Sequence, residues 1–319
     1  MNTTESNSKL TNRHPAGAKT AVLFVSFVLA VGTVVCLNAQ EQLTNKITRI
    51  VLLEWPEPAE DCIVVGATSL ASNAVRTPVP EPIFKRFGQL CMAVPATNTQ
   101  QFYKLVPGTQ FIDDFSDPKE PFAVRNPWVP GFYAPADADR WAVTPSNGVL
   151  RIQTLEIPAD PTGRLAIKSP GPYVQVKDFW VAVDILNIDA AHQGAGIGIG
   201  ARAAGSPWPG SVNGYIGNVW PNYEGRNQAR LSLWLGSSAT YSPSSFAFKP
   251  GTPYRLILSG VGRRLTVELI DLELQQPAVA PLVVTDSTFS QGFVGFLMSA
   301  GADTCDMTLD NFFVTGTKP

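Results

Sequence analysis

Histidine is almost absent from this sequence, which has two among 319 residues, and His192 is the only one beyond the amino-terminal segment. A zinc site built from a histidine cluster is therefore excluded, as is a Ser-His-Asp triad that does not use His192. His192 lies in the run DAAHQGAG, which is typical of a solvated loop. The motifs G-x-S-x-G and G-K-[ST] are missing as well, which excludes a nucleophile elbow and a P-loop.

Charged residues are scarce, at 16% of the chain, and the formal net charge is −2. No run of lysines and arginines occurs, which argues against nucleic acid as a partner. From Phe111 onward no segment has the 3.6-residue apolar period of an amphipathic helix. The chain has instead 27 prolines, 26 glycines and a hydrophobic content of 45%. Short apolar runs between such frequent breakers predict an all-β fold with many short strands.

The amino-terminal segment is organised like a secretory signal peptide. A polar stretch with three basic residues precedes the uncharged run Ala21–Cys36, and polar residues follow Ala39. This order predicts a signal peptide at residues 1–39. The run is shorter than the ~20 residues that span a bilayer, so an uncleaved membrane anchor is the alternative. Bulky Val35 disfavours a lipoprotein. We therefore expect a secreted, periplasmic or cell-surface protein.

Two cysteines, Cys62 and Cys91, fall in the segment that follows the leader. In an oxidising compartment we expect a disulfide between them, and the alternative is two separate core thiols. Cys305 lies beside the apolar alternation of the last expected strand, so we expect it to be a buried thiol.

Residues 40–106 predict a small β module. Its expected strands are Ile47–Trp55, Cys62–Val65, Ile83–Phe87, Leu90–Val94 and Gln101–Val106. The runs LEWP, DCIVVGATSL, TPVPEP and FYKL, in this order, resemble the small fibronectin-type-III-like modules of large exported bacterial proteins. The resemblance implies a spacer or adhesive role without chemistry. Pro107-Gly108 is expected to link this module to a second domain, residues 107–319.

The clearest strand signal in the chain is Tyr254–Asp271. Apolar and mixed positions alternate on both sides of the glycine-bounded turn Gly260–Arg264. A period of two on both sides of such a turn predicts a β-hairpin. The other strands expected beyond residue 107 are Gly148–Leu155, Arg164–Ser169, Phe179–Ile188, Gly194–Arg202, Gly214–Val219, Ala229–Leu235, Val283–Asp286, Phe293–Ser299 and Thr304–Val314.

So many short strands predict a two-sheet sandwich. The runs FIDDFSD, WAVTPSNGVLRIQ, DFWVAVDI, GIGIGAR, PYRLILSGVGRRLTVELID, GFVGF and DNFFV occur in this order. Together they resemble the concanavalin A-like (laminin-G-like) jelly-roll domains of exported bacterial proteins. The resemblance implies glycan binding or adhesion, with glycoside hydrolysis in a minority of such domains.

Glycoside hydrolysis needs two carboxyl groups about 5–9.5 Å apart. The E-x-D-x-x-E motif of laminarinase-like relatives of this fold is missing here. Asp271 and Glu273 share a strand face, but they fall where the strand ends and are expected to be solvated. Glu224 and Asp184 are left as isolated catalytic candidates. Because a fold alone does not confer activity, we expect no catalysis.

Oxygen ligands for calcium are expected where the first and last strands of the sandwich lie side by side. Asp310 with Asp113 or Asp114 is the candidate set for a structural Ca²⁺ site. The alternative is that these carboxylates cap turns. Asp306 shares a face with Asp310, but about 13 Å of strand separates them.

The run Gly196–Ala201 matches G-x-G-x-x-A, but the dinucleotide-binding reading fails because no helix follows. In a strand, the alternate glycines Gly194–Gly200 share one face while Ile197 and Ile199 point into the core. That bare face is either the floor of a ligand groove or a site of close backbone packing.

Aromatic residues concentrate in Ser206–Leu235 among asparagines and an arginine. Exposed aromatic planes bordered by amide and guanidinium groups suit sugars, which have apolar C–H faces and a rim of hydroxyls. The expected ligand residues are Trp208, Trp220, Tyr223, Asn222 and Arg226, whereas Trp234 and Tyr215 lie on strands and are assigned to the core.

The sequence therefore predicts an exported, non-catalytic protein that binds a polysaccharide or cell-surface glycan by aromatic stacking. The alternatives are a glycoside hydrolase and a purely structural cell-surface module.

The leader gives the first testable prediction. Intact-mass spectrometry of the secreted protein is expected to show a chain that begins at Gln40, because cleavage after Ala39 removes the leader. A chain that keeps residues 1–39 and partitions into the membrane fraction would instead show an uncleaved anchor.

Overall fold

The computed structural model describes residues 50–319, with gaps at 57–60, 97–99, 117–128, 133–138, 157–163, 169–173, 190–194, 204–212, 224–227, 236–237 and 301–303. The predicted leader, His192, Trp208, Glu224 and Arg226 lie outside the described residues. In the described ranges no helix combines the length and the hydropathy needed to cross a membrane. The same ranges contain no α-helix, which confirms the prediction of an all-β fold.

The first part of the chain builds a small core of its own. Three strands pair in the order β1-β5-β4, and β2, β3 and β6 belong to a larger sheet. Their bounds are β1 (Ile50–Pro56), β2 (Cys62–Ala67), β3 (Thr77–Pro78), β4 (Ile83–Arg86), β5 (Gln89–Pro95) and β6 (Phe102–Asp113). Trp55, Val64, Leu90, Met92 and Val94 are buried together in this core. The predicted strands are confirmed, and the likeness to a fibronectin-type-III module stays a prediction.

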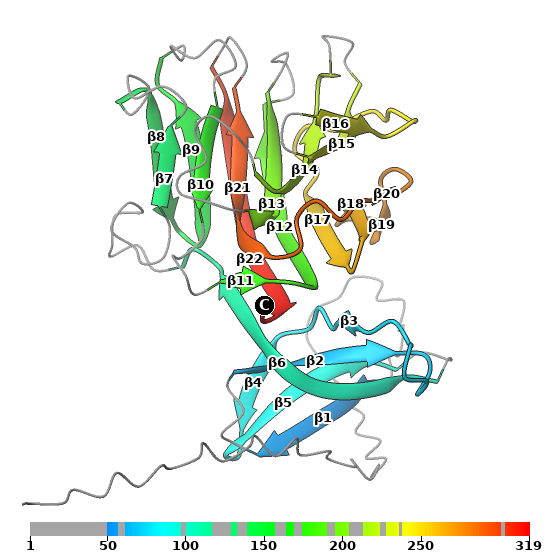
Figure 1. Cartoon of the computed structure of the whole chain (residues 1–319). Coiled ribbons are helices and arrows are strands. Elements are labelled where there is room, and N and C mark those ends of the chain that lie inside the picture. The colour runs from blue at the N-terminus through cyan, green and yellow to red at the C-terminus, as the bar shows by residue number, and fades with distance from the viewer. Residues whose placement is uncertain are drawn as a thin grey trace, which may run out of the picture. The chain divides into compact units, whose positions relative to one another are not determined.

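Two large antiparallel sheets build the rest of the chain (Figure 1). The eight-stranded sheet has the order β16-β15-β14-β13-β21-β10-β7, with β11 beside β21. Its strands are β7 (Val129–Phe132), β10 (Arg164–Lys168), β11 (Gln175–Val176), β13 (Gly196–Ala203), β14 (Tyr215–Trp220), β15 (Arg230–Leu235), β16 (Ser238–Tyr241) and β21 (Gly292–Ser299).

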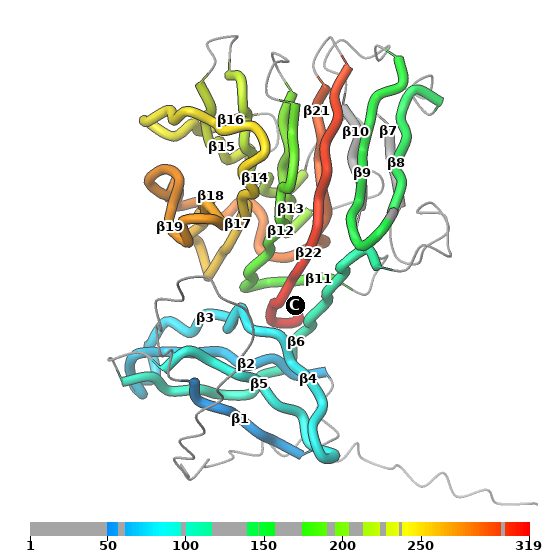
Figure 2. Tube along the Cα trace, turned by 180° about the vertical axis from the view of Figure 1, so that it is seen from behind, coloured from blue at the N-terminus to red at the C-terminus, as the bar shows by residue number. Residues whose placement is uncertain are grey.

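The eleven-stranded sheet has the order β19-β18-β17-β12-β22-β6-β2-β3, and its sandwich strands lie nearest the viewer in Figure 2. In addition, β20 pairs with β18, β9 with β22, and β8 with β9. The strands not yet given are β8 (Trp141–Ser146), β9 (Val149–Thr154), β12 (Phe179–Ile188), β17 (Tyr254–Val261), β18 (Arg264–Asp271), β19 (Gln276–Pro277), β20 (Leu282–Thr285) and β22 (Asp306–Thr317).

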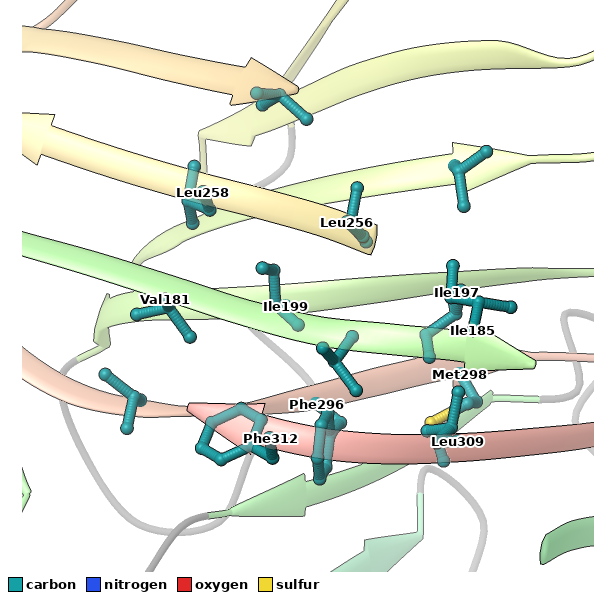
Figure 3. Packing of buried hydrophobic residues seen from close by; sticks show 14 of the residues in the cluster. Val181, Ile185, Ile197, Ile199, Leu256, Leu258, Phe296, Met298, Leu309 and Phe312 are labelled. Atoms are coloured by element: carbon teal, nitrogen blue, oxygen red, sulfur yellow. The ribbon is translucent and has the colours of Figure 1, made fainter. Parts of the chain in front are cut away.

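The main core lies between these two sheets, as predicted for a sandwich (Figure 3). Ile197 and Ile199 of β13 are fully buried in it. The rings of Phe296 and Phe312, one from each sheet, pack edge-on with centroids 4.6 Å apart. Each large apolar side chain buried here contributes about 1.5–3 kcal/mol. Period-two alternation thus places one face of every central strand in the core.

The hairpin β17–β18 forms where the alternation predicts it, but with a tighter turn. Val261 pairs with Arg264, so only Gly262 and Arg263 stand outside the ladder. Gly262 has a φ of 55°, which suits glycine at the first position of a two-residue hairpin turn. Tyr254 to Asp271 is therefore one continuous pair of strands.

The expected linker at Pro107-Gly108 is instead the middle of β6. The first half of β6 pairs with β2, and the second half pairs with β22. A side chain at Gly108 has no room, since its Cβ would lie 2.5 Å from Ile63 Cγ1 and 2.8 Å from the Gly316 carbonyl oxygen. One strand thus runs from the small core into the sandwich, and the domain boundary at residue 106 stays a prediction.

The predicted Cys62–Cys91 disulfide is absent, and both thiols are free. Cys62 lies on β2, whereas Cys91 lies on β5 in the other sheet of the small core, directly opposite Glu54 of β1. The Cys91 thiol is 3.8 Å from the Glu54 carboxylate. Burial, followed by the charge of Glu54, raises the pKa of Cys91. Cys305 is buried as predicted, and its burial raises the thiol pKa to about 12.

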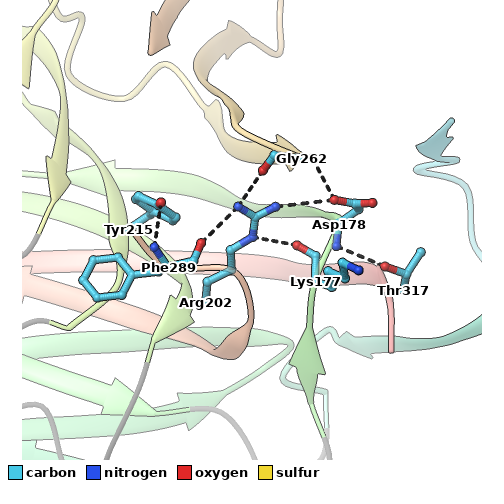
Figure 4. Close-up of polar contacts among 7 residues, drawn as sticks. All are labelled: Lys177, Asp178, Arg202, Tyr215, Gly262, Phe289 and Thr317. Carbon is cyan, nitrogen blue, oxygen red and sulfur yellow. Dashed lines mark hydrogen bonds and ion pairs between the residues drawn. The ribbon is translucent and has the colours of Figure 1, made fainter. Parts of the chain in front are cut away.

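A buried arginine joins the ends of several strands (Figure 4). Arg202 has only 1% of its surface exposed and has a φ of 52°. Its guanidinium donates to the carbonyls of Lys177, Gly262 and Phe289 at 2.6, 2.9 and 3.2 Å, and it pairs with Asp178 at 3.4 Å. Burial lowers the pKa of Arg202, and Asp178 opposes that shift.

The Arg202 contacts give a stability prediction. Arg202→Ala is expected to lower the free energy of unfolding by about 3–5 kcal/mol, because three carbonyls lose their donor and Asp178 keeps only the Gly262 amide. Urea unfolding followed by tryptophan fluorescence measures this change. The control Arg264→Ala removes an exposed arginine and is expected to cost about 0.5 kcal/mol or less. Equal costs for the two variants would contradict a structural role for Arg202.

Candidate functional site

The eight-stranded sheet has an outer face, which points away from the main core. Ile197, Ile199 and Ala201 belong to the core cluster, so the alternate positions Gly196, Gly198 and Gly200 lie on the other side of β13. The predicted division of this strand into an apolar face and a glycine face is therefore confirmed.

Strand register shows which residues share this outer face, because directly opposed residues of antiparallel strands point to the same side. The first row is Ser299, Gly196, Trp220 and Arg230; the second is Leu297, Gly198, Asn218, Ser232 and Tyr241; the third is Gly295, Gly200, Ile216, Trp234 and Ala239. We call these residues the aromatic face.

The glycines of β13 make room for side chains from the neighbouring strand. A Cβ at Gly196 would lie 2.8 Å from Cε3 of Trp220, and one at Gly198 would lie 2.0 Å from Oδ1 of Asn218. The indole and the amide thus rest directly on the β13 backbone. At Gly196 and Gly198 the structure therefore shows close packing on the backbone rather than an open groove floor.

A single hydroxyl fixes two indole rings. Ser232 Oγ accepts hydrogen bonds from Nε1 of Trp220 at 2.9 Å and from Nε1 of Trp234 at 3.1 Å. Ser232 itself is fully buried, while both indoles are half-buried. The benzo edge of Trp220 lies over Gly196 and its N–H edge is tied to β15, so this ring lies across the sheet surface.

Trp234 was assigned to the core from the sequence, and the structure corrects this assignment. Trp234 and Leu297 pack on the outer face against the small cluster of Ala203 and Ile216. Its neighbours Leu231 and Leu233 supply the core contacts. The alternation of Leu231–Leu235 carried this signal, but a tryptophan on a strand suggested burial. Ser232, Tyr241 and Arg230 were not predicted as site residues, because only strand register brings them together.

Tyr215 is a core residue, as predicted. Its ring is fully buried, and its hydroxyl donates to Asp286 Oδ1 at 2.6 Å and accepts from the Phe289 amide at 3.0 Å. Burial is the main cause that raises the pKa of Tyr215.

Tyr223 extends the aromatic face at its β16 edge, where it lies beside Tyr241 of the second row. The rings of Tyr223 and Tyr241 lie with centroids 5.2 Å apart. The guanidinium carbon of Arg230 lies 5.3 Å from the Tyr223 centroid, which is a cation–π geometry. Tyr223 is half-buried beside the face, as a ligand residue would be, whereas Asn222 is only 5% exposed and presents little surface to a ligand.

The catalytic candidate Asp184 is a structural residue. Its carboxylate accepts two bonds from Arg255, at 2.6 and 2.9 Å, and one from Asn311 Nδ2 at 3.0 Å. Asp184 is 3% exposed and lies on the eleven-stranded sheet. A carboxylate held in this way is poorly placed for acid–base work. The hydrolase alternative thus has only Glu224, outside the described residues.

The expected calcium ligands all bond backbone amides. Asp113 accepts from Phe115 N at 2.8 Å, Asp114 from Ser116 N at 3.1 Å, and Asp310 from the next amide at 2.6 Å. Burial raises the pKa of Asp310 most, and the charges of Asp184 and Asp114 raise it further. Within the described ranges no group of three or more potential ligand side chains is found. Calcium binding stays a prediction.

The sequence matches no known family model and no curated protein. Among solved structures, the carbohydrate-binding module CBM66 from Bacillus subtilis is 18% identical, with a TM-score of 0.37 over 58% of this chain and 93% of that chain. The Ulex europaeus lectin I in complex with the methyl glycoside of α-L-fucose is 8% identical, with a TM-score of 0.45 over 66% and 98%.

The endo-β-1,3(4)-glucanase SCLam of family GH16 is 13% identical, with a TM-score of 0.44 over 67% of this chain and 93% of that chain. These proteins share a concanavalin-like jelly-roll architecture.

The double hydrogen bond of Ser232 gives a prediction of its own. Ser232→Ala is expected to lower the free energy of unfolding by about 1–3 kcal/mol, because both indole N–H groups lose their acceptor. Thermal and urea unfolding measure the change. Ser238→Ala, at an exposed position of the neighbouring strand, is the control and is expected to cost about 0.5 kcal/mol or less. Indistinguishable costs would mean that Ser232 does not hold the rings.

Proposed function

We propose that this protein binds carbohydrate on the aromatic face of its eight-stranded sheet. The observation that carries the proposal is the pair of half-buried indoles, Trp220 and Trp234, held by one serine hydroxyl on the outer side of a β-sheet. A pyranose ring offers apolar C–H groups that stack on such surfaces.

Fixed rings favour binding because little conformational freedom is lost when the ligand arrives. Trp220 is held by the Ser232 hydroxyl and by the backbone at Gly196, so the bound orientation exists before the sugar stacks. Each stacked ring contributes about 1–2 kcal/mol at about 25 cal/mol per Å². Two rings with a few hydrogen bonds give a dissociation constant on the order of micromolar to millimolar.

The proposed role is binding without hydrolysis. Hydrolysis requires a pair of carboxyl groups beside the sugar, and the three rows of the aromatic face contain neither aspartate nor glutamate. The proposal includes export through residues 1–39, which would bring the face into contact with a polysaccharide or a cell-surface glycan.

Trp220→Ala tests the proposed function. Retention by polysaccharide in affinity electrophoresis is expected to fall by about tenfold, because the stacking surface is removed. Trp220→Phe keeps a ring and is expected to retain most of the binding. Phe87→Ala removes a phenylalanine that is 91% exposed on the small module and is expected to change nothing.

Thermal melts of the variants accompany the binding measurement. If Trp220→Ala melts as a folded protein and still binds as tightly as the parent, the aromatic face is not the carbohydrate site. Equal loss of binding in Phe87→Ala would contradict the proposal in the same way.

A further inference from the structure

Arg230 lies directly beside the stacking surface. It stands opposite Trp220 across the β14–β15 ladder, and directly opposed side chains have Cβ atoms about 4.5–5.5 Å apart. A sugar ring stacked on Trp220 would therefore have its substituents within reach of the guanidinium.

The position of this guanidinium is defined by aromatic contacts. It stacks over Tyr223, and Tyr223 in turn packs against Tyr241. No ion pair between Arg230 and a carboxylate is found in the described part of the chain. Arg230 thus combines a fixed position with a positive charge that no acidic side chain neutralises there.

The face around Arg230 offers the guanidinium no acidic side chain among its three rows. Both indole N–H groups are already bound to Ser232, and the three rows contain no carboxylate. The Arg230 guanidinium has five N–H donors and no acceptor. A neutral sugar hydroxyl accepts one hydrogen bond from such a guanidinium. The two oxygens of an anionic group can accept two parallel hydrogen bonds from it and thus match its planar geometry.

We propose that the aromatic face binds an anionic glycan, in which a carboxylate or sulfate oxygen accepts hydrogen bonds from Arg230 while the sugar ring stacks on Trp220. This inference rests on the proposed function, because it needs a sugar on the aromatic face. In this proposal Arg230 selects a negatively charged ligand, and the indoles supply stacking that does not depend on the charge of the sugar.

Two matched pairs of polymers test the inference. Affinity electrophoresis of the full chain compares polygalacturonate with its carboxyl-reduced form, and dextran sulfate with dextran. Binding to the anionic member of at least one pair is expected to be about tenfold or more tighter than to its neutral counterpart. The first pair isolates a carboxylate as the recognised group and the second isolates a sulfate ester.

The Arg230→Gln variant is expected to lose this preference, and Arg230→Lys to keep part of it, because lysine retains the charge without the planar fork. Arg264→Gln removes an exposed charge from the other sheet and is expected to bind like the parent protein. Raising NaCl from about 0.05 to 0.5 M should weaken the parent more than Arg230→Gln.

Each other outcome separates the inference from the proposed function. Equal retention of neutral and anionic polymers, unchanged in Arg230→Gln but lost in Trp220→Ala, overturns the anionic inference and leaves carbohydrate binding intact. Equal losses in Arg230→Gln and Arg264→Gln overturn it as well, since the attraction is then general to positive charge. Retention of none of the four polymers, with the parent folded, overturns both.

Discussion

The guanidinium of Arg202 closes one end of the sandwich. The geometry of the aromatic face depends on the bulge in β13 that turns this side chain away from the outer face. Simple alternation along β13 would place Arg202 on the outer face with Gly196, Gly198 and Gly200. Register shifts between Gly200 and Ala203, where Arg202 takes its left-handed conformation, and such a bulge redirects the side chain. The left-handed backbone costs about 1–3 kcal/mol, which the ion pair and three carbonyl bonds offset.

This bulge separates two functions of one strand. Up to Gly200 the outer side of β13 carries no side chain, and the Trp220 indole and the Asn218 amide settle onto it. Beyond Gly200 the strand supplies the arginine that binds carbonyls before β12, in the β17–β18 turn and before β21. The face that we propose binds sugar is therefore built on a strand whose far end is fixed to both sheets.

Local sequence predicted most strands, because alternation and glycine-bounded turns are properties of neighbouring residues. Tyr254–Asp271 is the clearest case, and its ladder runs as expected.

The sequence-based predictions failed where the structure depends on pairing between residues far apart in the chain. Pro107-Gly108 reads locally as a break, yet partners on two sides hold it in β6. Cys62 and Cys91 fall in the same short segment of the sequence, but their strands belong to different sheets. Trp220 was predicted as a ligand residue from the aromatic-rich composition of Ser206–Leu235. Trp234 and Arg230 became site residues only through cross-strand register.

The place of β22 in its sheet bears on the order of folding. This strand lies between β12 and β6, and it also pairs with β9, so three strands from well-separated parts of the chain meet at the last strand described. Until residues 306–317 are in place, the centre of the eleven-stranded sheet has open edges on both sides. The cost of closing such long loops is met before the contacts form, which makes assembly slow and cooperative. Because β6 also packs in the small core, the pairing of β22 with β6 joins that core to the sandwich.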